Sequence, residues 1–193
     1  TAITLQANND ITLNPASDVV TSAGGNGGAI TLEAGRSILL NSSITTDNGN
    51  LIITANHPGA DATTRDAGAG GITMASGTTL NAGTGTATLT VGSGVTGAAS
   101  GNLVVDNIIA ANVVLQQDGT TDGSSILQAS ASSLIQAANL SLSVTGAAGS
   151  IRSQAGPIHT SGVSQLTTSV LGSGDTAVQN TNGAGGLPLT VNS

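Results

Sequence analysis

The residues of this chain that could carry acid–base chemistry are ten acids and two histidines. Glycoside hydrolysis needs two carboxylates that face each other across a cleft, one of them with a raised pKa. Most of the acids stand singly in turn-like sequence, although Asp10 and Glu33 could meet on successive turns of a repeating fold. Sugar-cleaving sites also use aromatic platforms and several cations, whereas this chain has no aromatic residue and three arginines. The pattern predicts that the chain is not an enzyme.

Metal sites are the next chemistry to consider. His57 and His159 lie in turn-like sequence beside prolines, and a zinc site would need three or four ligands at a recognisable spacing. Residues 118–123 contain two Asp-Gly pairs, but they follow neither the EF-hand spacing nor that of Gly-rich calcium-binding repeats. We therefore expect surface histidines, a pair of turns, and no metal or other cofactor.

One stretch, residues 57–70, interrupts the regular pattern of the chain and carries its densest mixture of charges. Insertions in repeat proteins form loops on one face, which is often the binding face. A loop without a partner is the alternative, because extra loop length costs little entropy. We expect a protruding loop and take His57, Asp61, Arg65 and Asp66 as candidate binding residues.

The net charge limits the partners of the chain. Its formal value is −7, with no lysine. Nucleic-acid binding requires a basic surface, and anionic membranes also attract cations. The most hydrophobic region, residues 103–115, is interrupted by Asp106, Asn107 and Asn112, so that it is unsuited to spanning a membrane. We expect no nucleic-acid partner and no membrane insertion. The lack of cysteine suits a protein that is exported unfolded.

The elements that must position these side chains are short alternating triplets. Most have apolar first and third residues with Thr or Ser between them, the period-two pattern of a strand with one buried face. No segment shows a helical stripe. The residues expected to point inward are Ile30, Leu32, Ile38, Leu40, Leu51, Ile53 and Ile72, and those expected to point outward are Thr31, Thr54 and Thr73.

Composition indicates a narrow core. The chain has no Phe, Trp or Tyr, and aromatic rings usually fill the middle of a globular core. Aliphatic side chains alone suit a thin, elongated architecture. Charged residues are only 7% of the chain, and β-branched residues recur throughout, which disfavours disorder.

The spacing of the triplets predicts stacked coils. Ile30 and Ile38 are eight residues apart, which suits one strand and a tight corner. Ile30 to Leu51 and Leu51 to Ile72 are both steps of 21 residues, which suits one coil of a three-sided solenoid. At ~4.8 Å per coil, residues 1–193 would form one parallel β-helix of about nine coils. After residue 92 the triplets are irregular, and no register is predicted there.

Two side-chain patterns have alternative interpretations. Asn14, Asn41 and Asn81 each follow a triplet, and stacked asparagines could form an amide ladder or could be ordinary turn residues. Residues 84–90 place four threonines on one strand face, as in ice-binding solenoids, but the array occurs once and threonine favours strands in any case.

Two segments resemble the repeats of filamentous-haemagglutinin-like exoproteins. They are residues 28–41, GAITLEAGRSILLN, and residues 44–55, ITTDNGNLIITA, with a strand–DNGN–strand phrase typical of that family. The resemblance covers the first half of the chain well and the second half loosely. It implies a right-handed β-helix, adhesion without a cofactor, and two-partner secretion through an outer-membrane partner. The family's amino-terminal secretion domain is not recognisable, which suggests an internal piece of a larger protein.

We therefore expect a non-catalytic rod or stalk segment of a large bacterial adhesin, secreted or on the cell surface. Its loops would attach to a protein or glycan receptor on a host cell or another surface. The first alternative is a carbohydrate-active β-helix, either a polysaccharide lyase or hydrolase or a glycan-binding module. The second is an ice-binding solenoid, and autotransport in place of two-partner secretion also stays open.

Overall fold

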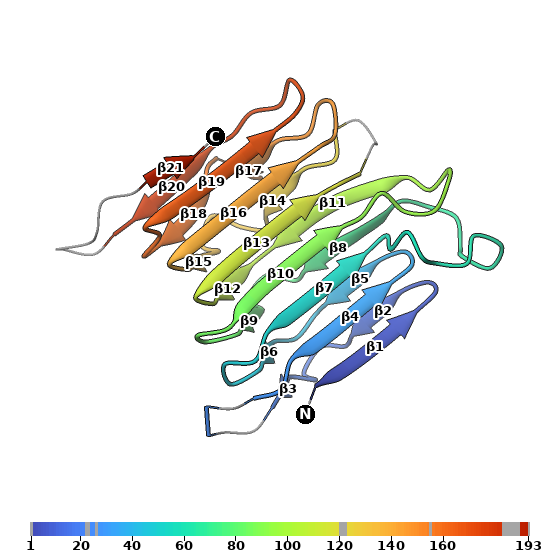
Figure 1. Cartoon of the computed structure of the whole chain (residues 1–193), viewed down its shortest axis with the longest axis horizontal. Coiled ribbons are helices and arrows are strands. Elements are labelled where there is room, and N and C mark those ends of the chain that lie inside the picture. Colours follow the sequence, from blue (N-terminus) through green and yellow to red (C-terminus); the bar gives the residue numbers. More distant parts are fainter. Residues whose placement is uncertain are drawn as a thin grey trace.

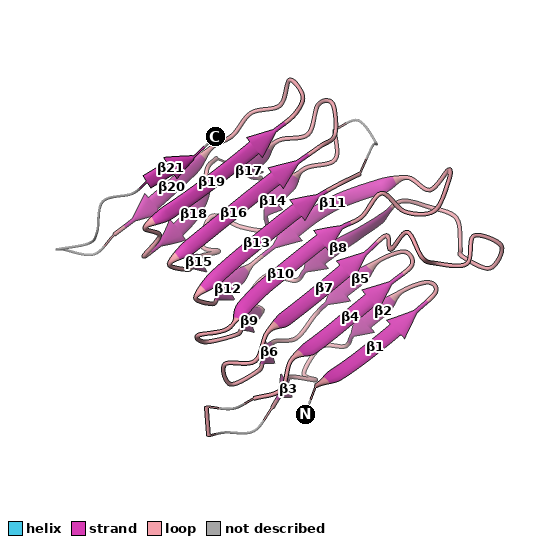
Figure 2. Ribbon diagram, viewed as in Figure 1, coloured by secondary structure: helices cyan, strands magenta, loops and turns pink. Residues whose placement is uncertain are grey.

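The computed structural model describes residues 2–21, 24–25, 27–119, 123–154, 156–182 and 190–192. These residues form β-strands and connecting loops, with no helix among them (Figures 1 and 2). The strands make three sheets, and neighbouring strands in every sheet run parallel. The chain visits the three sheets in turn and then returns to the first, an arrangement consistent with a parallel β-solenoid.

Sheet A is the longest of the three sheets. In spatial order it contains β1 (Ile3–Ala7), β4 (Ile30–Ala34), β7 (Leu51–Ala55), β10 (Thr86–Val91), β13 (Asn112–Gln117), β16 (Asn139–Val144), β19 (Gln165–Val170) and β21 (Thr190–Asn192). Its members cross the front of the molecule one above another in Figure 1.

Sheets B and C are built from shorter strands. Sheet B contains β2 (Ile11–Leu13), β5 (Ile38–Leu40), β8 (Gly70–Met74), β11 (Ser100–Val105), β14 (Ile126–Gln128) and β17 (Ile151–Ser153). Sheet C contains β3 (Val19–Val20), β6 (Ile44–Thr45), β9 (Thr79–Asn81), β12 (Asn107–Ile109), β15 (Ile135–Gln136), β18 (Ile158–Ser161) and β20 (Val178–Thr181).

The core lies between the three sheets and is aliphatic. Alternate residues of the central strands point into it, as in β7, where Leu51, Ile53 and Ala55 are fully buried. All seven residues predicted to point inward are buried, and Thr31, Thr54 and Thr73 lie on the outer faces. The predicted alternation is confirmed.

The coil spacing agrees with the prediction only in part. Ile30 pairs with Leu51 in neighbouring strands of sheet A, as the 21-residue step requires. The second 21-residue step is wrong, because Ile72 lies in sheet B and Leu51 pairs with Ala87. The long connection after β7 lengthens this coil. The step from Ile30 to Leu51 therefore joins two strands of one sheet, whereas the equal step from Leu51 to Ile72 joins two different sheets.

The second half of the chain is more regular than its sequence suggests. From β10 to β19, partners in sheet A follow at nearly constant steps, as in Thr86, Asn112, Asn139 and Gln165. Steps of this length give fewer strands per sheet than the predicted 21 residues would give. The described part of sheet A has eight strands, and the number of coils in the whole chain stays a prediction.

Of the two interpretations of Asn14, Asn41 and Asn81, the structure excludes the shared amide ladder. Asn14 and Asn41 follow strands of sheet B, whereas Asn81 ends β9 in sheet C and accepts a hydrogen bond from Gly83 N at 2.9 Å. These three residues therefore form no common ladder. An amide contact between neighbouring strands joins Asn139 Nδ2 to Asn112 Oδ1 at 2.7 Å on sheet A.

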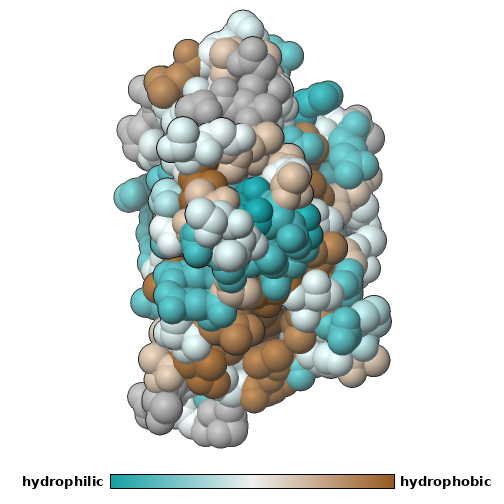
Figure 3. All heavy atoms as spheres, turned by 90° about the vertical axis from the view of Figure 1, so that its right-hand side faces the viewer, coloured by the Kyte–Doolittle hydropathy of each residue, from teal (hydrophilic) through white to brown (hydrophobic). Residues whose placement is uncertain are grey.

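The β1 end of the stack exposes apolar side chains. Ile3 and Leu5 are 52% and 49% exposed, whereas their partners Ile30 and Leu32 in β4 are 3% and 8% exposed. They line a hydrophobic hollow of about 200 Å³ together with Ile11 and other core residues. Figure 3 shows hydrophobic residues gathered at the lower end of the molecule, beneath a hydrophilic area near its middle.

Candidate functional site in the loop between β7 and β8

Residues 56–69, which link β7 to β8, form the longest connection between consecutive strands. This loop extends beyond the strands at the right of Figure 1. It lies at the corner where sheet A passes to sheet B, beside residues 92–99, which link β10 to β11 at the same corner. Two shallow grooves flank the loop, and it contains all four predicted binding residues.

The loop folds back onto the first coil. Asn8 Oδ1 accepts a hydrogen bond from Asp61 N at 2.6 Å, and Asn8 Nδ2 donates to Thr64 Oγ1 at 3.0 Å. The neighbouring Asn9 Oδ1 accepts from Asp66 N at 2.6 Å. Both asparagines follow β1, more than 50 residues earlier in the chain. The loop therefore crosses the corner of β4 and attaches to the corner after β1.

An ion pair supports the same corner. Arg36 Nε donates to Asp10 Oδ1 at 2.8 Å, and a second guanidinium nitrogen contacts the other carboxylate oxygen. Arg36 also donates to Ala67 O at 3.0 Å, which fixes the far part of the loop. The Arg36 guanidinium holds the pKa of Asp10 below its usual range, because it donates to the charged carboxylate. Asp10 also accepts from Ser37 N at 2.9 Å.

Arg65 acts within the loop rather than on its surface. Its Nε donates to Gly35 O at 2.6 Å, and its terminal nitrogens donate to Asp66 O at 2.9 Å and Gly68 O at 3.2 Å. One of them also donates to Asn56 Oδ1 at 3.0 Å. A guanidinium presents five N–H donors in a fixed fork, which suits several carbonyls converging on one corner. Most of the binding capacity of Arg65 is therefore used inside the chain.

The two loop acids have separate environments. Asp61 Oδ1 accepts from Thr63 N at 2.9 Å and from Thr63 Oγ1 at 2.7 Å, and these bonds lower the pKa of Asp61. The Asp66 side chain is 61% exposed, with Oδ2 at 3.8 Å from an Arg36 nitrogen. An exposed pair at this distance contributes little stability, so the Asp66 carboxylate stays available to solvent.

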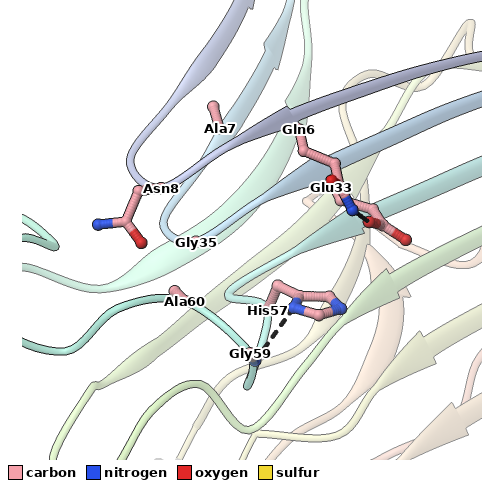
Figure 4. A pocket seen from close by; sticks show the side chains of 8 residues that line it. All are labelled: Gln6, Ala7, Asn8, Glu33, Gly35, His57, Gly59 and Ala60. Carbon is pink, nitrogen blue, oxygen red and sulfur yellow. Dashed lines mark hydrogen bonds between the residues drawn. The ribbon is translucent and has the colours of Figure 1, made fainter.

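The first groove lies between the loop and the outer edges of β1 and β4. It measures about 240 Å³ and is lined by Gln6, Ala7, Asn8, Glu33, Gly35, His57, Gly59 and Ala60. Figure 4 shows Gln6 hydrogen-bonded to Glu33 on one side and the His57 ring on the other. His57 Nδ1 accepts from Gly59 N at 3.0 Å, which orients the ring.

The second groove lies between the loop and residues 92–99. It measures about 290 Å³ and is lined by Ala62, Arg65, Asp66, Ala67, Gly68, Val95, Thr96, Gly97, Ala98 and Ala99. Small residues leave it open, and Asp66 and Thr96 supply exposed polar groups. The structure thus brings Arg65 and Asp66 to one groove and His57 to the other, while Asp61 lines neither.

The geometry gives little support to acid–base chemistry. Asp10 and Glu33, the spaced pair of acids, contact Arg36 and Gln6 respectively. Within the described residues, no three His, Cys, Asp or Glu side chains come together as metal ligands. Residues 120–122 of the Asp-Gly stretch lie outside the described part of the chain. The exposed Asp66 carboxylate and Thr96 hydroxyl and the partly buried His57 imidazole can instead form hydrogen bonds with a bound surface.

Sequence reasoning missed the residues that hold the loop. Asn8, Asn9 and Arg36 were not among the candidate residues, and Asp10 was considered only as a possible partner of Glu33. The sequence did contain a signal for this contact. Three consecutive polar residues follow β1, and an arginine stands at the equivalent place after β4. Only the register of the two strands shows that these residues are adjacent.

No described residue belongs to a helix long and apolar enough to cross a membrane.

Comparison of the chain with protein-family models, with curated proteins and with solved structures finds no match. The function of the chain must therefore be argued from its own residues.

Proposed function

We propose that this chain is a non-catalytic rod segment of a large bacterial adhesin, secreted or exposed at the cell surface. The rod is a right-handed parallel β-helix of about nine coils, similar to those of filamentous-haemagglutinin-like exoproteins. The parent protein is exported with an outer-membrane secretion partner. The loops of the rod attach to a protein or glycan receptor on a host cell or another surface.

The observation that supports this proposal most is the contrast between a uniform scaffold and one elaborated corner. Parallel strands repeat along the chain around an aliphatic core, so that each coil supports the next one. The loop of residues 56–69 and its neighbour at 92–99 adjoin on the corner between sheets A and B. A binding surface on loops held by a rigid scaffold is a common arrangement in repeat proteins.

The loop is also prepared for binding. Asn8 and Asn9 accept hydrogen bonds from its backbone, and its Arg65 side chain donates to Gly35 O, so that the loop is held before any partner arrives. A preorganised loop loses less conformational entropy on binding than a free one. The second groove therefore offers Asp66 on a fixed frame, beside Thr96 of residues 92–99.

Attachment is tested with beads that carry the purified chain. We expect these beads to bind cultured animal cells more than beads that carry an unrelated acidic protein do. The double variant Asp66→Ala and Thr96→Ala, which removes two exposed groups of the second groove, should lower binding severalfold. The matched control is Asp175→Ala with Thr176→Ala, which removes two exposed groups far along the chain.

Two results would contradict the proposal. The first is binding no greater than that of the unrelated protein on every cell type tried. The second concerns catalysis, for which the chain is incubated with acidic and neutral polysaccharides. New reducing ends or unsaturated products that disappear when one Asp is changed would show an enzyme.

A further inference from the structure

The outer face of sheet A carries a second polar surface, away from the loop. Its five central strands, β7, β10, β13, β16 and β19, contain no charged residue. Their outward side chains are Ile52, Thr54, Thr86, Thr88, Thr90, Asn112, Val114, Gln116, Asn139, Ser141, Ser143, Gln165, Thr167 and Ser169. This face is therefore rich in hydroxyl and amide groups but electrically neutral.

Parallel register arranges these side chains in columns along the stack. One column contains Thr86, Asn112, Asn139 and Gln165, and the next contains Thr88, Val114, Ser141 and Thr167. Neighbours within a column are ~4.8 Å apart, and the two columns are separated by ~6.6 Å, two residues along a strand. A groove of about 190 Å³ runs between the columns across β13, β16 and β19.

The first column has spare hydrogen-bonding capacity. Asn139 Nδ2 donates to Asn112 Oδ1 at 2.7 Å, and Asn112 Nδ2 donates to Thr86 Oγ1 at 3.4 Å. Each amide has a second N–H and further lone pairs that these contacts do not use. Asn139 and Gln165, neighbours in this column, are exposed to solvent, and so is Thr167 of the second column.

We propose that this groove binds an extended, uncharged polysaccharide that lies along the axis of the stack. A sugar residue of an extended glycan advances by about one strand spacing, so that successive sugars meet successive rungs of the two columns. Sugar hydroxyls both donate and accept, as the amides and hydroxyls of the groove do. The neutral face matches a neutral polymer, and the net charge of −7 repels polyanions such as uronates.

The composition of the groove favours a glycan over ice. An ice-binding plane needs one hydroxyl residue repeated in every coil, whereas the second column is interrupted by Val114. Long amide side chains of the first column also stand above the strand surface and give a groove rather than a plane. The attachment proposed for the loop concerns a different surface, so either proposal can fail alone.

The test is affinity electrophoresis of the purified chain through gels that contain one polysaccharide each. The probes are mixed-linkage β-glucan, glucomannan and dextran as neutral polymers, and alginate and heparin as polyanions. We expect a neutral, extended β-linked polymer to retard the chain. The variant Asn139→Ala with Gln165→Ala should bind that polymer roughly tenfold more weakly, the effect of two lost hydrogen bonds.

Two further variants make the result specific to the groove. Gln136→Ala with Gln179→Ala removes two exposed amides from sheet C and should bind as the unmodified chain does. Ser141→Gln fills the groove without removing an amide and should weaken binding. Circular dichroism verifies that each variant is folded.

Four results would overturn the proposal. They are retardation by no neutral polymer, equal weakening by the sheet A and sheet C variants, stronger retardation by heparin or alginate than by any neutral polymer, and thermal hysteresis of ice growth that is lost in Ser141→Gln.

Discussion

The environments of two aspartates, Asp118 and Asp10, shift their side-chain pKa values in opposite directions. Burial raises the pKa of Asp118, because its charged form is partly removed from water. The hydrogen bonds that Arg36 donates lower the pKa of Asp10. A carboxyl group whose pKa is higher in the folded chain than in the unfolded chain makes folding less favourable as the pH increases through that pKa. A carboxyl group whose pKa is lower in the folded chain contributes stability that is lost on acidification.

Asp118→Asn is therefore expected to stabilise the chain at pH 7. The gain should be below about 1 kcal/mol, since the Asp118 side chain is only partly buried and solvent still screens its charge, or no more than about 2–4 °C in the unfolding temperature. It should vanish as pH falls below the ordinary aspartate value of 3.8, where both side chains are neutral. Thermal unfolding between about pH 3 and pH 7, a range that covers the titration of aspartate, measures this difference.

Asp10→Asn is the matched control and should do the opposite. It should destabilise the chain at pH 7, because Arg36 loses its charged acceptor, and the difference should shrink on acidification through the depressed pKa of Asp10. A loss of stability for Asp118→Asn at pH 7 would show that its carboxylate makes favourable contacts in the native chain.

Single residues also show how far the sequence predicts the site. His57 and Asp66 reach the grooves, as an exposed polar loop leads one to expect. The role of Arg65 could not be predicted, because its acceptors are backbone carbonyls, which leave no mark in the sequence. The binding roles of the four loop residues remain predictions.

The elements of the fold follow from two different sources. Alternation of apolar and polar residues places each strand and its buried face, and the structure confirms it for Ile30 to Met74. The coil length depends instead on corner insertions, which carry no periodicity. The 21-residue step from Leu51 to Ile72 therefore did not identify paired residues. The alternation of apolar and polar residues did identify the buried face of each strand.

At the level of the loop, Arg65→Lys should release residues 56–69 from the corner. A lysine cannot donate to Gly35, Gly68 and Asn56 in the planar fork of a guanidinium. The local opening free energy should fall by about 1–2 kcal/mol, the range for a partly solvated charged hydrogen bond. Hydrogen exchange at the amides of Asp61 and Asp66 should then accelerate roughly 5- to 30-fold.

The control for this prediction is Arg152→Lys on β17, whose side chain is exposed. It should leave the exchange of the loop amides unchanged. Equal exchange in both variants would mean that Asn8 and Asn9 hold the loop without Arg65.

The whole molecule is a stack whose β1 end presents unpaired strand edges. Ile3, Leu5 and Val20 are exposed there, although the equivalent positions in later strands are buried or partly covered. Exposed edges with apolar side chains template pairing with another chain. Contacts between unlike ends do not close on themselves and can continue indefinitely.

We therefore expect the isolated chain to associate end to end at high concentration. The net charge of −7 opposes association at low salt, and added salt screens this repulsion. Light scattering should rise with concentration, and more steeply at moderate ionic strength. Leu5→Asp should suppress the rise, because a charge on an edge strand opposes pairing.

Leu39→Asp is the corresponding control, since Leu39 is exposed on β5, between β2 and β8, and not on an end. It should leave association unchanged. A chain that stays monomeric at every concentration and salt level would indicate that the ends are protected from pairing.

The attachment of the β7–β8 loop to Asn8 and Asn9 has a mechanical consequence. Strands of a parallel stack can separate one rung at a time when tension acts along the axis, because each rung is held only by its neighbours. The loop bypasses β4 and ties the corner after β1 directly to β7. A pulling force at the β1 end is therefore shared by three rungs, so that the first strand cannot separate without also breaking the contacts of the loop.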